Sequence, residues 1–294
     1  MPEVERLAAV TGRDSALAGA EAMHQPGQIG EYLSAKDLGR VRRLAFDFTR
    51  GRHLSILEQF QCCTGGYNRL AMLLYYITDR KGFEGDESEQ RAALLRRIAD
   101  AARVGVDFIQ LREKDLAADE LHQLAHEALS AVRENSTVTK LLINSYADIA
   151  IAVGADGVHL PSGFPPPDEI RDQWLRHSDR EPIIGVSAHT VEDVRQAEST
   201  GASFAVLAPI FEKTATGAKG IGLKALRLAC SLPSKKQRSF AVLALGGVTL
   251  ANARSCVNAA AAGVAGIRLF QQGDVSRTVQ ALREIVRHNT HPAN

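Results

Sequence analysis

The sequence predicts an α/β protein with a (β/α)8 TIM barrel in residues 72–294. Short apolar runs rich in β-branched and aromatic residues alternate there with longer stretches whose apolar residues recur every three or four positions. This alternation repeats eight times, which is typical of parallel strands joined by crossover helices. A doubly wound open sheet is the alternative, but no G-x-G-x-x-G sequence follows the first predicted strand.

Each predicted strand is a run of five to eight residues, and a helical pattern follows most of them. The strands are predicted at residues 73–79, 108–114, 140–145, 157–161, 183–189, 204–210, 240–247 and 263–270. The helices are predicted at residues 88–104, 118–133, 191–199, 250–262 and 276–287. Residues 1–71 show little sustained periodicity and are expected to form a weakly ordered or helical N-terminal extension.

Composition excludes several classes of partner. The formal net charge is +1, so no overall field draws the chain to nucleic acid or to an anionic membrane. No apolar run approaches the roughly 18 residues that a membrane span needs. The four cysteines lack the spacing of a disulfide framework or a metal site, which fits a reducing compartment. We therefore expect a cytoplasmic protein, and a homo-oligomer is compatible with the sequence.

The second predicted strand carries the first candidate site. Gln110, Arg112 and Lys114 share one face, because strand side chains alternate. Two cations at one position favour a bound anion such as phosphate or diphosphate. The alternative is an internal ion pair with Glu113 or Asp115.

Polar residues also end the third, fifth and sixth predicted strands. Asn144 offers a donor and an acceptor to a polar ligand, and His189, on the same face as Ser187, is a candidate acid or base, although such a histidine is often structural. The segment after the sixth strand carries cations and hydroxyls suited to a phosphorylated ligand, or to solvent, namely Lys213, Thr214 and Thr216.

The seventh and eighth strands predict a second anion site. Gly246 and Gly247 end the seventh strand, and Ile267 and Arg268 lie in the eighth. In TIM barrels the loops after these two strands commonly form a phosphate site, and glycine lets backbone N–H groups approach the anion. One substrate pair, or one substrate with a phosphate tail, would use both sites.

Taken in order, these segments resemble the thiamine phosphate synthase/TenI family. The resemblance runs from about residue 73 to residue 270, through YYITD, QLREK, LLIN, ADGVHL, IIGVSAHT, PIFE, LALGGVT and GIRLF. Residues 1–71 have no counterpart in it.

The resemblance implies a thiamine phosphate synthase, a transferase of thiamine biosynthesis. Such enzymes join hydroxymethylpyrimidine diphosphate to a thiazole phosphate and release diphosphate. It implies that Gln110, Arg112, Lys114 and Asn144 hold the pyrimidine diphosphate, with Ser187 close to its diphosphate. It also implies that Gly247, Ile267 and Arg268 hold the thiazole phosphate. The candidate catalytic residues are Lys114, Ser187 and His189.

The sequence departs from the family at the two magnesium-binding aspartates. Ser145 and Phe164 occupy those positions. Mg²⁺ prefers carboxylate and phosphate oxygens. Mg²⁺ would therefore be bound by the diphosphate oxygens alone, or be bound with a substitute ligand such as Asp168, or not be used.

Two other functions stay open. In the TenI branch a thiazole tautomerase needs no metal, and His189 would then transfer the proton. The third possibility is a barrel that binds thiamine precursors without catalysis.

Overall fold

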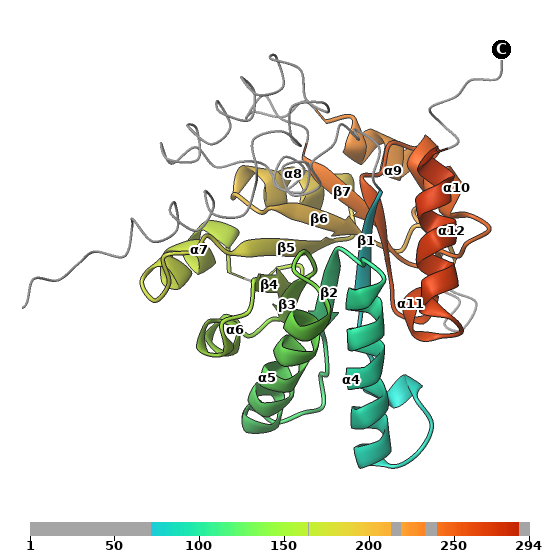
Figure 1. Cartoon of the computed structure of the whole chain (residues 1–294). Coiled ribbons are helices and arrows are strands. Elements are labelled where there is room, and N and C mark those ends of the chain that lie inside the picture. The colour runs from blue at the N-terminus through green and yellow to red at the C-terminus, as the bar shows by residue number, and fades with distance from the viewer. Residues whose placement is uncertain (1–71, 164, 213–218, 233–239, 288–294) are drawn as a thin grey trace, which may run out of the picture. The chain divides into compact units, whose positions relative to one another are not determined.

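Eight parallel strands close into a barrel in the computed structural model, which describes residues 72–163, 165–212, 219–232 and 240–287 (Figure 1). Each strand pairs with the next along the chain, and β8 pairs back to β1 with Tyr76 opposite Gly266. The predicted TIM barrel is confirmed. The expectations for residues 1–71 lie outside the described residues.

The strands are short, and helices surround them (Figure 1). The strands are β1 (Leu73–Ile77), β2 (Phe108–Leu111), β3 (Lys140–Asn144), β4 (Gly157–Leu160), β5 (Ile183–Ala188), β6 (Phe204–Leu207), β7 (Ala241–Ala244) and β8 (Gly263–Gly266). The helices are α4 (Glu87–Arg103), α5 (Ala118–Asn135), α6 (Ala147–Val153), α7 (Pro167–Leu175), α8 (Val191–Ser199), α9 (Gly222–Cys230), α10 (Ala253–Asn258), α11 (Arg268–Gln271) and α12 (Val275–Arg287), with a 3-10 turn η1 (Arg80–Gly82).

The alternation of side chains separates two apolar layers. On β1 and β2, Tyr75 and Phe108 belong to the cluster inside the barrel, whereas Tyr76 and Ile109 pack in the cluster between strands and helices. Inside, Phe108 stacks on Phe204 with ring centroids 5.2 Å apart. The barrel interior is therefore filled with side chains, as in other barrels of eight strands. Polar residues that continue the inward-facing positions emerge at the carboxyl ends of the strands.

The eighth strand is shorter than predicted. It ends at Gly266, and residues 268–270 of the predicted strand lie in the helix α11, which continues to Gln271. Phe270 is fully buried by that helix. A short buried helix gives the same apolar run as a buried strand, so periodicity does not separate them. Arg268 accordingly lies at a helix start and not in a strand.

Polar side chains tie the strands together at the opposite end of the barrel. The residue before β2, Asp107, accepts a hydrogen bond from the backbone N–H of Leu74 at 2.7 Å. Asp156, the residue before β4, accepts a hydrogen bond from the backbone N–H of Leu141 at 2.9 Å. Ser203, the residue before β6, accepts one from the backbone N–H of Ile184 at 3.0 Å. These contacts satisfy strand N–H groups at the barrel floor.

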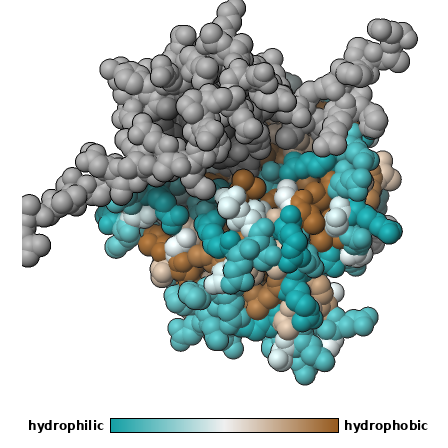
Figure 2. All heavy atoms as spheres, viewed as in Figure 1, coloured by the Kyte–Doolittle hydropathy of each residue, from teal (hydrophilic) through white to brown (hydrophobic). Residues whose placement is uncertain are grey.

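The described surface is mixed in character. In Figure 2 hydrophilic residues cover much of the visible barrel, with hydrophobic residues between them. The exposed large hydrophobic side chains are dispersed along the chain, at Val138, Tyr146, Leu175, Leu228 and Leu250. None of the described helices is both long enough and apolar enough to cross a membrane.

Candidate functional site

Three polar residues lie at the end of β2 and just beyond it. Gln110 is buried, and its Nε2 donates to Asn144 Oδ1 of β3 at 3.1 Å. Arg112 and Lys114 follow the strand; Arg112 is half-buried and Lys114 is exposed. The register of β2 against β3, with Gln110 opposite Leu142, brings this amide pair together. The pair offers donors and acceptors to a heterocycle.

The two acids that flank Lys114 point elsewhere. Glu113 is buried, accepts from the Thr78 hydroxyl at 2.6 Å and accepts from the backbone N–H of Arg80 at 3.0 Å. Burial raises the pKa of Glu113, although its hydrogen bonds with Thr78 and Arg80 oppose the rise. Thr78 also accepts from the backbone N–H of Arg112 at 2.9 Å.

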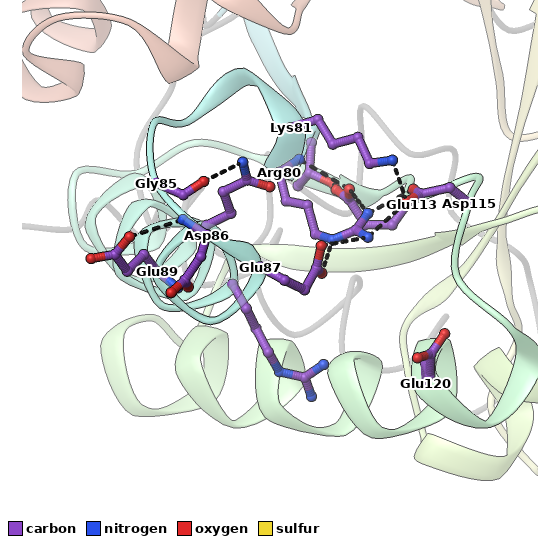
Figure 3. Close-up of polar contacts among 12 residues, drawn as sticks. Arg80, Lys81, Gly85, Asp86, Glu87, Glu89, Glu113, Asp115 and Glu120 are labelled. Carbon is purple, nitrogen blue, oxygen red and sulfur yellow. Dashed lines mark hydrogen bonds and ion pairs between the residues drawn. The ribbon is translucent and has the colours of Figure 1, made fainter.

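Arg80 is the centre of this acidic cluster (Figure 3). Its guanidinium donates to both carboxylate oxygens of Asp115, at 2.6 and 2.7 Å, and to Glu113 at 3.3 Å. It also donates to both oxygens of Glu87, at 2.5 and 3.2 Å. Lys81 lies 2.8 Å from Asp115. Hydrogen bonds from Arg80 hold the pKa of Asp115 well below its usual value.

This arrangement argues against the internal ion pair as the interpretation of the second strand. Glu113 and Asp115 pair with Arg80, and neither forms an ion pair with Arg112 or Lys114. Within the described ranges Arg112 and Lys114 have no carboxylate partner at all. Two cations without internal counter-charges are suited to an external anion.

Ser145 is the residue at which the resemblance implies a magnesium-binding aspartate. Ser145 has φ +67°, and its hydroxyl accepts from Asn144 Nδ2 at 2.8 Å. Asp168 is exposed at the start of α7, where it accepts from the backbone N–H of Glu169. Phe164 lies outside the described residues. Among those that are described, no three His, Cys, Asp or Glu side chains gather as a metal site.

A hydrogen-bonded chain crosses the barrel interior to Ser187. The Tyr75 hydroxyl lies 3.1 Å from His159 Nδ1, and His159 Nε2 lies 2.9 Å from Ser187 Oγ. Burial, with a smaller contribution from the Arg112 charge, lowers the pKa of His159 to about 3. The imidazole is therefore neutral at neutral pH and fixes the position of the Ser187 hydroxyl. Sequence reasoning placed Ser187 at the site but gave His159 no role.

His189 is exposed just after β5. Its Nδ1 donates to the backbone carbonyl of Ala208 at 3.0 Å, since a carbonyl can only accept. Its Nε2 is then unprotonated in the neutral ring and has no partner among the described residues. Its own backbone N–H donates to Asp193 at 2.8 Å. The pKa of Asp193 is lowered, because this bond and those from Thr190 outweigh its partial burial, which acts to raise it.

The loop after β7 and the start of α11 form the second candidate site. Gly246 and Gly247 have φ values of +91° and +66°. A Cβ on Gly246 would lie 2.7 Å from Pro209 Cα, and one on Gly247 would lie 2.8 Å from Phe211 Cβ, so glycine is needed at both positions. The backbone N–H groups of Gly246, Gly247, Ile267 and Arg268 donate no hydrogen bond within the described part of the chain. They are available to an anion.

Three predicted residues of the segment after β6 cannot be placed. Lys213, Thr214 and Thr216 lie outside the described residues. Before them, the N–H of Phe211 donates to the carbonyl of Gly246 in the β7 loop at 3.0 Å. After them, the N–H of Ile221 donates to the carbonyl of Pro209, which lies just after β6, at 2.8 Å.

Comparison with known proteins agrees with this architecture. A family model described as thiamine monophosphate synthase matches residues 74–270, which covers all eight strands except the first residue of β1. The chain belongs to the thiamine monophosphate synthase family. The resemblance drawn from the sequence is confirmed.

Relatives of this family cover most of the barrel. A putative thiamine-phosphate synthase 2 from Aquifex aeolicus is 38% identical over 199 residues, which is 67% of this chain and 96% of that protein. A thiamine-phosphate synthase from Syntrophomonas wolfei is 32% identical over 217 residues, 74% of this chain and 97% of that protein. The solved thiamine phosphate pyrophosphorylase from Pyrococcus furiosus is 27% identical with a TM-score of 0.59, covering 74% of this chain and 96% of that one.

Sequence reasoning missed several residues of this site. Thr78 and Arg80 follow β1, and the polar run after an apolar strand was a signal that they stand at the barrel mouth. Which acid each would meet depends on the pairing of β1 with β2, where the N–H of Thr78 donates to the carbonyl of Gln110 at 3.0 Å. No local pattern specifies that contact.

Proposed function

We propose that this protein is a thiamine phosphate synthase, a transferase that joins hydroxymethylpyrimidine diphosphate to thiazole phosphate and releases diphosphate. The observation that carries the proposal is that Arg112 and Lys114 have no carboxylate partner among the described residues, because the neighbouring acids Glu113 and Asp115 pair with Arg80. The chain also belongs to a family named for this reaction.

The diphosphate site is assigned to the end of β2. Arg112 and Lys114 face the leaving diphosphate, and Ser187, held by His159, donates its hydroxyl nearby. Gln110 and Asn144, already bonded to each other, contact the pyrimidine ring. Fixed cations at a leaving group that gains negative charge stabilise the transition state more than the ground state.

The thiazole phosphate site is assigned to the backbone of Gly247 and Ile267, with the Arg268 guanidinium beside it, and to Gly246 as the residue that shapes the loop. Lys213, Thr214 and Thr216 would approach from the segment after β6. Because β1 pairs with β2 on one side and with β8 on the other, the two anion sites flank β1. Two strand spacings amount to about 10 Å, a separation that two substrates can bridge at the mouth.

The reaction breaks one bond and forms another. The bond between the pyrimidine methylene carbon and the diphosphate oxygen breaks first, and the diphosphate leaves with the electron pair. The pyrimidine stabilises the resulting cation, and the lone pair of the thiazole nitrogen then forms the new C–N bond. Arg112 and Lys114 hold the departing charge, and the two sites hold the substrates within reach of each other.

Magnesium remains a prediction. With Ser145 at the position of one aspartate, Mg²⁺ would be carried by the substrate diphosphate or assisted by Asp168, and we derive no step from it. We also propose that residues 72–294 form the catalytic unit, which follows the N-terminal extension in the chain, and that the protein is cytoplasmic. Its partners are small phosphorylated substrates, and neither nucleic acid nor a membrane is among them. Homo-oligomerisation is open to test.

A thiazole tautomerase is the second candidate, and His189 favours it. With Nδ1–H bonded to Ala208, the free Nε2 is oriented as a base that could move a proton on a thiazole carboxylate phosphate. That reaction needs no diphosphate site, so the cations of β2 count against it.

The assay supplies pyrimidine diphosphate and thiazole phosphate, with and without Mg²⁺, and in parallel the tautomerase substrate. We expect thiamine phosphate from the full chain and a drop of about a hundredfold in Lys114→Ala, because one fixed charge at the leaving group is lost. Lys140→Ala is the control, since Lys140 pairs with Asp156 at the barrel floor. Full turnover in Lys114→Ala contradicts the site. If the protein forms only the thiazole tautomer, and His189→Asn abolishes that product, the second candidate is correct. If neither assay gives a product, the protein is a barrel that binds thiamine precursors without catalysis.

A further inference from the structure

Charges alternate along the chain after β2. Arg112, Glu113, Lys114 and Asp115 follow one another, so each cation of the proposed diphosphate site has an acid beside it in the sequence. An acid next to a cation at a rim is its nearest counter-charge and competes with any external anion for it. The structure shows why this competition does not occur here.

Arg80 engages the acids. A guanidinium has five N–H donors, and Arg80 makes five contacts with them, to Glu87, Glu113 and Asp115. Its side chain is 3% exposed. With every donor used and the side chain buried, Arg80 itself is not free to bind a substrate. Its charge serves the neighbouring carboxylates (Figure 3).

Glu113 also fixes the direction of the chain. Thr78 and the backbone N–H of Arg80 hold its carboxylate on the helix side of the sheet. Arg112 and Lys114 are its direct neighbours in the chain beyond the end of β2 at Leu111, so fixing Glu113 restricts where both side chains can lie. Thr78 links the two effects, since its hydroxyl donates to Glu113 and accepts from the N–H of Arg112.

We propose that Arg80 and Glu113 are positioning residues for substrate binding: Arg80 withdraws Glu113 and Asp115 from the strand-2 cations, and Glu113 holds those cations toward the barrel mouth. Neither residue contacts substrate. The inference rests on the proposed diphosphate site at β2.

The test uses inorganic diphosphate as the probe and titration calorimetry on the full chain. We expect Arg80→Gln to weaken diphosphate binding about tenfold, because Asp115 then keeps only the exposed Lys81 as a partner and can turn to Lys114 or Arg112. Adding Asp115→Asn removes that competitor, so the double variant should recover to within about threefold of the natural protein. Asp115→Asn alone should bind as the natural protein does. If Arg80 were only structural, the loss of affinity would instead follow the loss in the free energy of unfolding, measured on the same variants by urea denaturation.

Kinetics supply a second readout. Glu113→Gln should raise KM for the pyrimidine diphosphate about tenfold, while KM for thiazole phosphate stays within about twofold, because only the β2 site is misplaced. A general loss of structure would raise both. Arg91→Gln is the matched control, since Arg91 pairs with Glu127 between α4 and α5.

The outcomes separate the inference from the function on which it rests. If Lys114→Ala leaves diphosphate affinity unchanged, the proposed site is wrong. If Lys114→Ala weakens binding but Arg80→Gln does not, or if Asp115→Asn fails to repair it, the positioning role is wrong. Should Arg80→Gln not fold, Arg80→Lys replaces it. The lysine ammonium has three donors in place of five, so we expect Arg80→Lys to bind diphosphate about threefold more weakly and Asp115→Asn to repair that loss. If Arg80→Lys binds diphosphate as tightly as the natural protein does, the proposal is wrong.

Discussion

His159 shows at the scale of one residue how the barrel interior serves the mouth. It is 3% exposed, lies between two hydroxyls and is kept neutral by burial. An ionised imidazole there would face the Arg112 charge across an apolar interior. A neutral ring can donate to one hydroxyl and accept from the other, so it holds Ser187 without adding charge to the diphosphate site.

The lowered pKa of His159 predicts a pH dependence of stability. Its folded-state pKa of about 3 lies below the ordinary value of 6.5, so the unfolded chain binds the proton first as the pH falls. Its contribution is present above about pH 6.5 and is lost toward pH 3, with a slope of up to about 1.4 kcal/mol per pH unit. In urea unfolding from pH 7 to pH 4, His159→Gln should flatten the fall in the free energy of unfolding by that slope.

The same substitution at His122 is the control for that measurement. His122 is exposed on α5, so its ring meets water in both states. We expect the pH dependence of His122→Gln to follow that of the natural sequence. An unchanged slope in His159→Gln would show that the buried imidazole is not the group responsible.

At the scale of elements, the β7 loop is specified by packing as well as by backbone conformation. Gly246 and Gly105 both have positive φ, +91° and +84°. A Cβ on Gly105 meets nothing within 4 Å, whereas one on Gly246 meets the backbone of Pro209 at 2.7 Å. The two glycines therefore separate the cost of the φ angle from the cost of the collision.

Alanine at these positions gives a direct prediction. Gly105→Ala should lower the free energy of unfolding by about 1 kcal/mol, the cost of a left-handed residue. Gly246→Ala should lower it by about 3 kcal/mol or more and should also weaken thiazole phosphate binding, because the β7 loop and the 209–212 segment must separate. Chemical denaturation and titration calorimetry measure the two effects. If both variants lose the same free energy of unfolding, the predicted collision with Pro209 does not affect stability.

The sequence was sufficient for elements defined by local patterns. Alternation alone put Gln110, Arg112 and Lys114 on the face opposite Ile109 and Leu111, and the structure agrees for the strand itself. It was insufficient where a contact joins distant segments. The pairing of Arg80 with Asp115 spans 35 positions, and the link from His159 to Tyr75 spans 84. The prediction that the eighth strand continues past Gly266 was wrong, because a buried helical turn and a buried strand have the same apolar pattern.

At the scale of the whole molecule, barrel closure brings distant segments of the chain together. Residues at the end of β2 and at the end of β8 are about 155 positions apart in the chain, yet both strands pair with β1. Closure therefore brings the two proposed anion sites to one mouth, as a reaction between a diphosphate and a phosphate requires. The central claim is that these are two sites and that both are occupied together.

The direct measurement is a titration of inorganic diphosphate into the full chain, first alone and then with saturating thiazole phosphate. Two separate sites predict one diphosphate bound per chain in both titrations, with a Kd that changes by no more than about twofold or becomes tighter, and that weakens in Lys114→Ala but not in Gly247→Ala. Competition, with the apparent Kd rising in proportion to the thiazole phosphate concentration, would show a single anion site and contradict the account.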